Sequence, residues 1–304
     1  MGNISPKTNY AALSGNIDGL IADATAGGFS ACVPSLLHIM AANFPALMRQ
    51  HNPVVMNLES WTQLSLAFII QEYSGFSNAA IHMFLEARIR NRWPALTKEI
   101  MRNMDEEMGA LSQGVPHLEL MRHGYRRELG IETDGLRYTA VTEDFINRMN
   151  GLFRDSDNTF LAGVLLAFEA TAVDEFRIVE RILRRYKELI GGEITDDSLT
   201  GQYIAGHVMP GTPTPDRDPE MDHYRGMVDA VGGNVDDGNL RPLVQGFFSV
   251  CLELNRWWEQ IALEAIQKEI RDQLKRNGAA PQEPYPSFAQ AGIPTPGRIL
   301  LIAE

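Results

Sequence analysis

Apolar residues recur three and four positions apart through most of the chain, and stretches in which apolar and polar residues alternate are rare. Spacing of three and four residues is typical of amphipathic helices, whereas alternation is typical of strands. The pattern therefore predicts an all-α fold. The expected helices cover about residues 8–24, 33–50, 56–90, 94–109, 117–129, 141–153, 157–190, 195–208, 220–232 and 238–276.

Proline and glycine support several of these boundaries. Pro94 and Pro116 suit the first turn of a helix, where an amide hydrogen has no partner within the helix. Gly109 and Gly191 suit the residue that follows a helix, because glycine adopts the left-handed conformation easily. The segment 210–219 contains four prolines, which cannot continue a helix. It is therefore expected to be an irregular loop.

The simplest organisation is one helical domain, residues 1–277, followed by an extended C-terminal tail, residues 278–304. No internal repeat or shift in composition marks a boundary within the helical part, and the tail is rich in Pro, Gly and Ala. A chain of 304 residues can bury a large core without disulfides. The two cysteines, Cys32 and Cys251, are too few for a cysteine-based zinc or iron–sulfur site, so any metal must be bound by His, Asp or Glu.

The net charge of −12 disfavours nucleic acid as a partner, because phosphate binding depends on clustered Lys and Arg. Basic clusters such as Arg122, Arg126 and Arg127 are interleaved with acids, which is typical of solvent-exposed helix faces. The longest apolar run, 160–173, is too short to span a membrane, and the first residues lack the apolar core of a signal peptide. A cytoplasmic protein with no membrane partner is expected.

One carboxylate interrupts that apolar run. Residues 160–173 read FLAGVLLAFEATAV, in which Glu169 is the only charged residue. A helix of this composition is buried, and an unpaired buried carboxylate costs several kcal/mol. Glu169 must therefore be protonated, paired with a core arginine, or bound to a metal ion.

A second candidate lies where two expected helices meet. The first ends in Glu106 and Glu107, and after a short loop the next opens with Pro116 and His117. A carboxylate on a last turn and an imidazole on a first turn can converge, and Glu107 with His117 would suit iron or manganese. The alternative is an ordinary charged corner of the surface. His123 lies on a different face of the second helix and is not expected to join them.

A third candidate surrounds the proline-rich loop. Glu220 and His223 are three residues apart, so both project from one face of a helix, as in the Glu-x-x-His pairs of di-iron helical proteins. His207 ends the preceding helix and can fold back toward that face. Three separated clusters of acids and histidines, together with a buried glutamate, favour a metal site more than any one cluster does.

These residues carry a resemblance to a known family. The runs NMDEEMG (103–109) and PHLELMRHGYRRELG (116–130) resemble the heme-oxygenase-like di-iron oxidases, the iron-containing redox enzymes of the TenA/PqqC-like helical superfamily. In that family an acid, then a histidine that opens the next helix, are metal ligands. A glutamate in an apolar helix follows, matched here by Glu169 in LLAFEATAVDEF. The resemblance covers about residues 56–262.

The family motif closes with His-x-x-x-Asp-x-x-His, and here the chain departs from it. Segment 210–219 interrupts the spacing, and the acid that precedes His223 is Glu220 rather than aspartate. An ungapped alignment would put Asp216 in the place of the first histidine. We prefer His207 at this position, because imidazole is the family's ligand and a loop can be accommodated between the two helices.

The resemblance implies a heme-oxygenase-like multi-helical bundle around two Fe(II) ions that activate dioxygen, with the second ion weakly held. An extra carboxylate from an earlier helix can join such a site. Glu72 and Glu86 are the candidates, and Glu72 is preferred because apolar residues surround it in sequence. The implied metal ligands are Glu72, Glu107, His117, Glu169, His207, Glu220 and His223.

By the same resemblance the expected function is a non-heme di-iron oxidase or oxygenase of secondary metabolism. Its substrate would be a small, amino-acid-derived molecule, held by Arg or Lys through a carboxylate, and the outcome N-oxygenation, desaturation or C–C cleavage. Two alternatives stay open: a metal-free TenA/PqqC-like hydrolase or oxidase that uses acids and histidines for proton transfer, and a non-catalytic helical binding protein. Besides the small-molecule substrate, a homodimer partner is considered.

Overall fold

Helices account for nearly all regular structure in the computed structural model, which describes residues 10–110, 112, 114–209 and 218–276. The described part contains no strand, so the predicted all-α class is confirmed. The α-helices are α1 (Tyr10–Thr25), α2 (Gly28–Asn43), α3 (Pro53–Met56), α4 (Gln63–Arg90), α5 (Pro94–Glu107), α6 (His117–Gly124), α7 (Ala140–Phe153), α8 (Asn158–Leu189), α9 (Leu199–Ala205), α10 (Pro219–Gly232) and α11 (Leu240–Arg276).

Local sequence explains where several helices begin. Asp157 caps α8 by accepting hydrogen bonds from the amides of Thr159 and Phe160. Thr62 caps α4 in the same way, so this helix begins at residue 63, later than the predicted 56. Ser198 caps α9, which shortens the predicted 195–208 helix to seven residues. The predicted 33–50 helix instead ends at Asn43, before a 3-10 turn (Pro45–Leu47).

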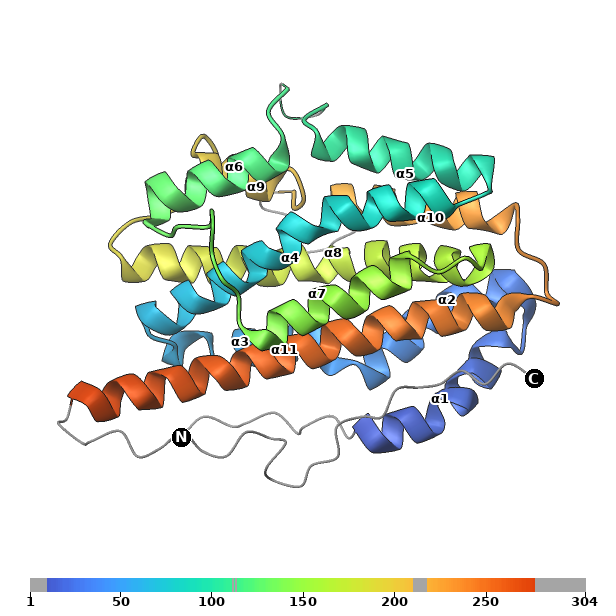
Figure 1. Cartoon of the computed structure of the whole chain (residues 1–304), viewed down its shortest axis with the longest axis horizontal. Helices are drawn as coiled ribbons and strands as arrows, with labels where there is room; N and C mark the ends of the chain where they lie inside the picture. The colour runs from blue at the N-terminus through green and yellow to red at the C-terminus, as the bar shows by residue number, and fades with distance from the viewer. Residues whose placement is uncertain (1–9, 111, 113, 210–217, 277–304) are drawn as a thin grey trace.

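Three long helices, α4, α8 and α11, form the body of the bundle, with α7 packed against all three (Figure 1). The approach of α8 to α11 depends on two glycines. A Cβ atom on Gly163 would lie 1.9 Å from the carbonyl oxygen of Leu243, and one on Gly246 would lie 2.1 Å from that of Phe160. No residue but glycine fits these contacts, which fix α8 against the core.

The shorter helices form a second layer over α8. Helix α10 packs on both α8 and α5, and α6 packs on α9 (Figure 1). The predicted 117–129 helix is continuous but changes to a π-helical turn (Tyr125–Leu129), which Gly130 ends with a φ of +69°. This layer brings the end of α5, the start of α6, the end of α9 and the start of α10 over the middle of α8.

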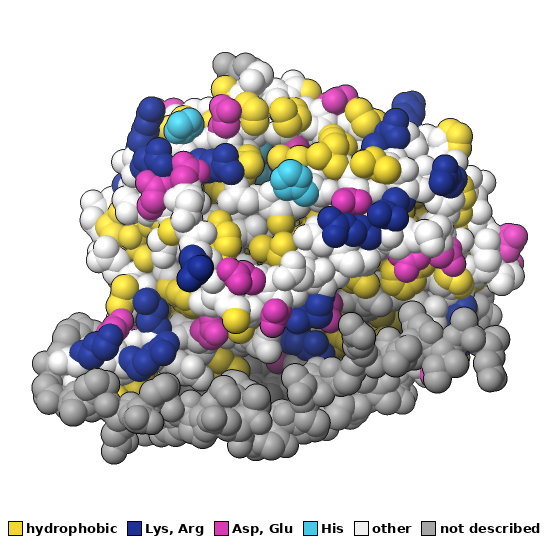
Figure 2. Space-filling view, in the orientation of Figure 1, with side chains coloured by type: hydrophobic (Ala, Val, Ile, Leu, Met, Phe, Trp, Pro, Cys, Tyr) yellow, Lys and Arg dark blue, Asp and Glu magenta, His cyan; other side chains and the backbone are white. Residues whose placement is uncertain are grey.

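Basic and acidic side chains are interleaved on the face of the molecule shown in Figure 2, as the charge pattern predicts. Arg126, for example, pairs with Glu132 and Asp134 at 2.6 and 2.7 Å. Within the described residues no helix combines the length and apolarity that a membrane crossing requires. The predicted tail, 278–304, lies outside the described residues.

Candidate metal centre

Two groups of potential metal ligands lie next to each other between the second layer and α8. The first group is Glu107, His117 and His207, and the second group is Glu169, Glu220 and His223. Within each group, one ligand atom from every residue lies within 4.8 Å of those from the other two. The residues that the sequence picks out in three separate clusters are thus brought together in space.

Each ligand comes from a helix end or a buried helix face. Glu107 is the last residue of α5 and His117 the first of α6. His207 lies two residues after α9, whereas Glu220 lies in the first turn of α10. Gly109, with a φ of +101°, follows α5 as expected for the residue that lets the chain turn back.

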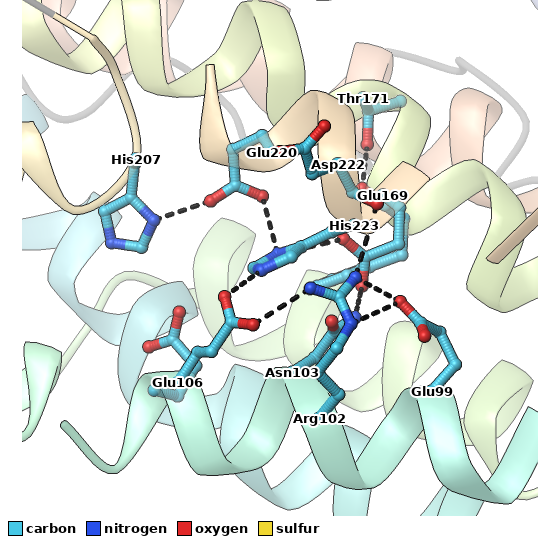
Figure 3. A network of polar contacts seen from close by, with 12 residues as sticks. Glu99, Arg102, Asn103, Glu106, Glu169, Thr171, His207, Glu220, Asp222 and His223 are labelled. Atoms are coloured by element: carbon cyan, nitrogen blue, oxygen red, sulfur yellow. Dashed lines mark hydrogen bonds and ion pairs between the residues drawn. The ribbon is translucent and has the colours of Figure 1, made fainter. Parts of the chain in front are cut away.

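Glu220 connects the two groups. Its Oε1 atom lies 2.6 Å from Nδ1 of His207 in the first group, and its Oε2 atom lies 3.6 Å from Nδ1 of His223 in the second (Figure 3). Burial alone would raise the pKa of Glu220, but the hydrogen bonds with the two histidines lower it to about 2. This carboxylate is therefore ionised and faces both groups at once.

The first group contains two imidazoles with unused nitrogen atoms. Nε2 of His117 and Nε2 of His207 are both buried and without a hydrogen-bond partner. The two rings lie edge to face with their centroids 4.7 Å apart, and His207 stacks on Phe176 at 3.6 Å. Buried polar atoms are rarely left unpaired, and a neutral imidazole nitrogen is the commonest protein metal ligand. A metal ion would satisfy both atoms.

His117 also contacts the third member of the first group. Its Nδ1 atom lies 3.4 Å from Oε1 of Glu107. Burial alone would lower the pKa of His117, but the neighbouring carboxylate raises it above its usual value. Burial alone would raise the pKa of Glu107. The hydrogen bond with His117 and the charge of His207 instead lower this pKa below its usual value. The contact between His117 and Glu107 therefore favours the charged form of both side chains.

The second group is supported by polar side chains of α5. Asn103 donates a hydrogen bond of 2.7 Å to Glu169, whose side chain is only 3% exposed. Nε2 of His223 lies 2.5 Å from Glu106, and Glu106 in turn pairs with Arg102 at 2.9 Å (Figure 3). A carboxylate behind a histidine fixes the orientation and tautomer of a metal ligand. Nδ1 of His223 is left facing Glu169 and Glu220.

The pKa values of this group reflect its burial. Burial raises the pKa of Glu169 to about 8, although the charge of His223 opposes it. Burial lowers the pKa of His223, but Glu220 and Glu169 overcome it and raise the value to about 10. A metal ion entering this group must therefore displace protons, which makes its binding depend on pH.

A buried ion pair positions the helix that carries Glu220 and His223. Arg177 of α8 makes two hydrogen bonds, of 2.7 and 2.9 Å, to Asp218, the residue that precedes α10. Asp218 also accepts a hydrogen bond from the backbone amide of Met209. The start of α10 is thus tied to α8. Asp216, the alternative to His207, lies outside the described residues.

Neither candidate for an extra carboxylate lies beside the two groups. Glu72 is buried as expected, but its oxygens accept hydrogen bonds from the amide of Thr139 at 3.2 Å and from its hydroxyl at 3.0 Å. Glu86 is half-buried and forms ion pairs with Arg154 and Arg90 at 3.0 and 3.5 Å. Each carboxylate therefore has other partners, and neither residue belongs to a ligand group or lines the cavity.

A cavity of about 80 Å³ opens onto both groups. Its walls are mostly apolar, and the expected Arg or Lys is not among the described residues that line it. Glu175 of α8 also lines the cavity, although the sequence pattern does not single it out because it lies beyond the apolar run. The lining residues other than the metal-ligand candidates are Tyr73, Phe76, Ser77, Ala80, Ile81, Phe84, Asn103, Leu118, Met121, Phe168, Ala172, Glu175, Phe176 and Tyr203.

Comparisons with known proteins agree on the fold. The chain is similar to a CADD-like protein of unknown function from Nostoc punctiforme, seen in two crystal structures. For one, the TM-score is 0.69 at 23% identity, covering 78% of this chain and 98% of that chain. For the other, the TM-score is 0.68 at 24% identity, covering 79% and 97%. At this identity the likeness shows a shared fold.

A search of curated proteins found no match. A family model, described as "Domain of Unknown Function with solved-structure structure (DUF3865)", matches residues 31–264. This range is well over half of the chain and includes both ligand groups and the helices that carry them. The chain therefore belongs to the DUF3865 family.

Proposed function

We propose that this protein is a non-heme di-iron oxidase or oxygenase that uses dioxygen to oxidise a small metabolite. Glu220 is the main support, because a single ionised carboxylate faces both ligand groups. Two adjacent groups that share a carboxylate are the arrangement expected of a two-ion site rather than of two unrelated ion pairs.

The ligand types favour iron. The two groups offer three imidazoles and three carboxylates, a mixture that suits Fe(II) or Mn(II) better than Mg(II) or Ca(II), which prefer oxygen alone. The unpaired Nε2 atoms of His117 and His207 favour a metal over a metal-free acid–base site, because proton transfer alone gives those atoms no partner. The choice of iron over manganese follows the family resemblance.

Each side chain has a defined task in this proposal. Glu107, His117 and His207 would hold one ion, Glu169 and His223 would hold the other, and the carboxylate of Glu220 faces both groups. Asn103 and Glu106 keep Glu169 and His223 in place. Bound Fe(II) supplies the electrons and open coordination positions that dioxygen activation requires. The aromatic walls exclude water, which protects the reaction from side products.

Metal content tests the proposal. The chain is reconstituted anaerobically with Fe(II), desalted and analysed for iron, and then exposed to oxygen. We expect two ions per chain, uptake of oxygen and a transient absorption in the visible range. Less than one ion per chain, with no oxygen uptake, would rule the oxidase out. A cytoplasmic location, a role in secondary metabolism and a homodimer remain predictions.

Asp222→Asn is a matched control for substitutions of Glu220. Asp222 lies two residues away on α10, but its side chain is 72% exposed and pairs with Arg225. This variant should bind as much iron as the unmodified chain, while Glu220→Gln should bind less. Equal iron in both variants would contradict the assignment of Glu220.

A further inference from the structure

Acidic side chains outnumber basic ones in the lining of the cavity. Among the described residues that line it there are four carboxyl groups and two imidazoles, with no Arg or Lys. Three of the carboxyl groups belong to the two ligand groups, where histidines or metal ions balance them. Glu175 is the fourth, and it belongs to neither ligand group.

Glu175 is buried under conditions that disfavour an isolated carboxylate. It is 6% exposed and lines the same cavity as Tyr73. Burial raises the pKa of Glu175 to about 8, although the hydroxyl group of Tyr73 opposes this shift. Tyr73 is itself fixed by stacking on Trp258 and by an edge contact with Phe76. The carboxyl group of Glu175 is thus buried at the wall of a cavity whose described lining contains no Arg or Lys.

The rest of the wall fits an apolar body. Phe76, Phe168 and Phe176 line the cavity together with Leu118 and Met121. A ligand that combines an apolar surface with one cationic group would match both features. A ligand carboxylate, in contrast, would find no Arg or Lys to pair with among the described lining residues.

We propose that Glu175 binds the protonated amine of a small, otherwise apolar molecule; that this amine is the substrate rests on the proposed oxidase function. Charge pairing would ionise Glu175 when the ligand enters and give the buried carboxylate its missing partner. The ligand's apolar part would then lie along the phenylalanine wall. The substrate class becomes an amine without a carboxylate, in place of the expected carboxylate-bearing amino acid derivative.

Calorimetric titration of the metal-free, full-length chain with hexylamine, hexanol and hexanoate tests this assignment. The probes share an apolar body but differ in charge, and without metal no probe can bind by coordination. We expect hexylamine to bind roughly 10- to 100-fold more tightly than hexanol, as for a hydrogen bond to a charged partner, and hexanoate to bind more weakly than both. The titrations are repeated with Zn(II), which is redox-inert, bound.

Three variants identify the residue responsible. Glu175→Gln keeps the size of the side chain and should lose the preference for hexylamine over hexanol. Glu175→Asp keeps the charge and should retain the preference. Glu188→Gln changes an acid on the same helix whose side chain is 60% exposed, and it should behave as the unmodified chain. Circular dichroism checks that each variant is folded.

Two results would overturn the assignment. Hexylamine preference that survives in folded Glu175→Gln would show that another acid binds the amine. Loss of one metal ion per chain in Glu175→Gln would show that Glu175 is a metal ligand instead. Failure of the proposed function has a different signature, since an unmodified chain that binds no iron can still show the amine preference that depends on Glu175.

Discussion

The two ligand groups differ in how well they are held before any metal arrives. In the second group the three members are buried, and Asn103 and Glu106 fix two of them through hydrogen bonds. In the first group the side chain of Glu107 is 26% exposed, and the Nε2 atoms of both histidines lack partners. The second group is therefore preorganised by the protein, whereas the first group needs a metal ion to complete it.

This difference predicts two unequal metal sites. Preorganised ligands lose less freedom when they bind, which favours the second group. The second group also holds its protons more tightly, because the pKa of His223 is about 10. Acid should therefore weaken metal binding more at the second group than at the first. Glu220 belongs to both environments and couples them.

The largest effect is expected for Glu220→Ala. Removal of the shared carboxylate leaves His207 and His223 without their common partner, and the iron content should fall from two ions per chain to less than one. Elemental analysis after anaerobic reconstitution measures this directly. Retention of one full ion would show that the groups are independent, which would break the proposed coupling.

Glu106→Gln should weaken the second group selectively. The carboxylate behind His223 orients the ring, and loss of such partners typically reduces metal affinity roughly 10- to 100-fold. Titration against a chelator resolves the two affinities. Glu99→Gln is the matched control, because Glu99 also pairs with Arg102 on α5 but belongs to neither ligand group. An equal loss at both sites in Glu106→Gln would contradict the assignment.

Gly206→Ala should weaken the first group by a smaller amount. A Cβ atom at this position would lie 3.0 Å from Cε1 and Nε2 of His117, so the ring must shift by a few tenths of an ångström. We expect roughly a tenfold loss of affinity there, by analogy with other changes that misorient a ligand. The same chelator titration detects it, and unchanged affinity would mean that His117 does not bind through Nε2.

The smallest effect concerns the stability of the metal-free chain. The pKa of Glu169 is raised from 4.5 to about 8, so its contribution to stability is present below pH 4.5 and lost as the pH rises through 8. The pKa of Glu107 is lowered, so its contribution is present above pH 4.5 and lost in acid. Thermal unfolding is measured from pH 4 to 9. The unfolding temperature should depend less on pH at the alkaline end in Glu169→Gln, and less on pH at the acidic end in Glu107→Gln.

Identical pH profiles for these two variants would remove the electrostatic distinction between the groups. The measurement requires removal of metal by a chelator beforehand, because a bound ion would ionise both carboxylates. Addition of Fe(II) should then raise the unfolding temperature of the unmodified chain, since a ligand that binds only the folded state stabilises it.

Most of the fold follows from the sequence. The apolar spacing, together with the prolines and glycines that end helices, predicts the all-α class and the long helices to within a few residues. The predicted 33–50 helix is wrong at its end, because α2 stops at Asn43 before a 3-10 turn. Two other errors occur where a cap decides the boundary: Thr62 starts α4 later than its apolar pattern suggests, and Ser198 does the same for α9. A cap is a single hydrogen bond, which periodicity does not reveal.

The candidate site is predicted less evenly. Acids and histidines at helix ends, together with a lone glutamate in an apolar helix, point to the six residues that the structure brings together. Glu72 shows the limit of this reasoning, because apolar neighbours predict its burial but not the loop residue Thr139 that occupies its carboxylate. The absence of a basic residue from the described cavity lining likewise depends on packing between distant helices.

Anomalous X-ray scattering at the iron edge, on crystals of the reconstituted chain, tests the central claim most directly. We predict two iron peaks, one beside Glu107, His117 and His207 and the other beside Glu169 and His223, with Glu220 in contact with both. A single peak, or peaks outside these residues, would contradict the two-iron centre.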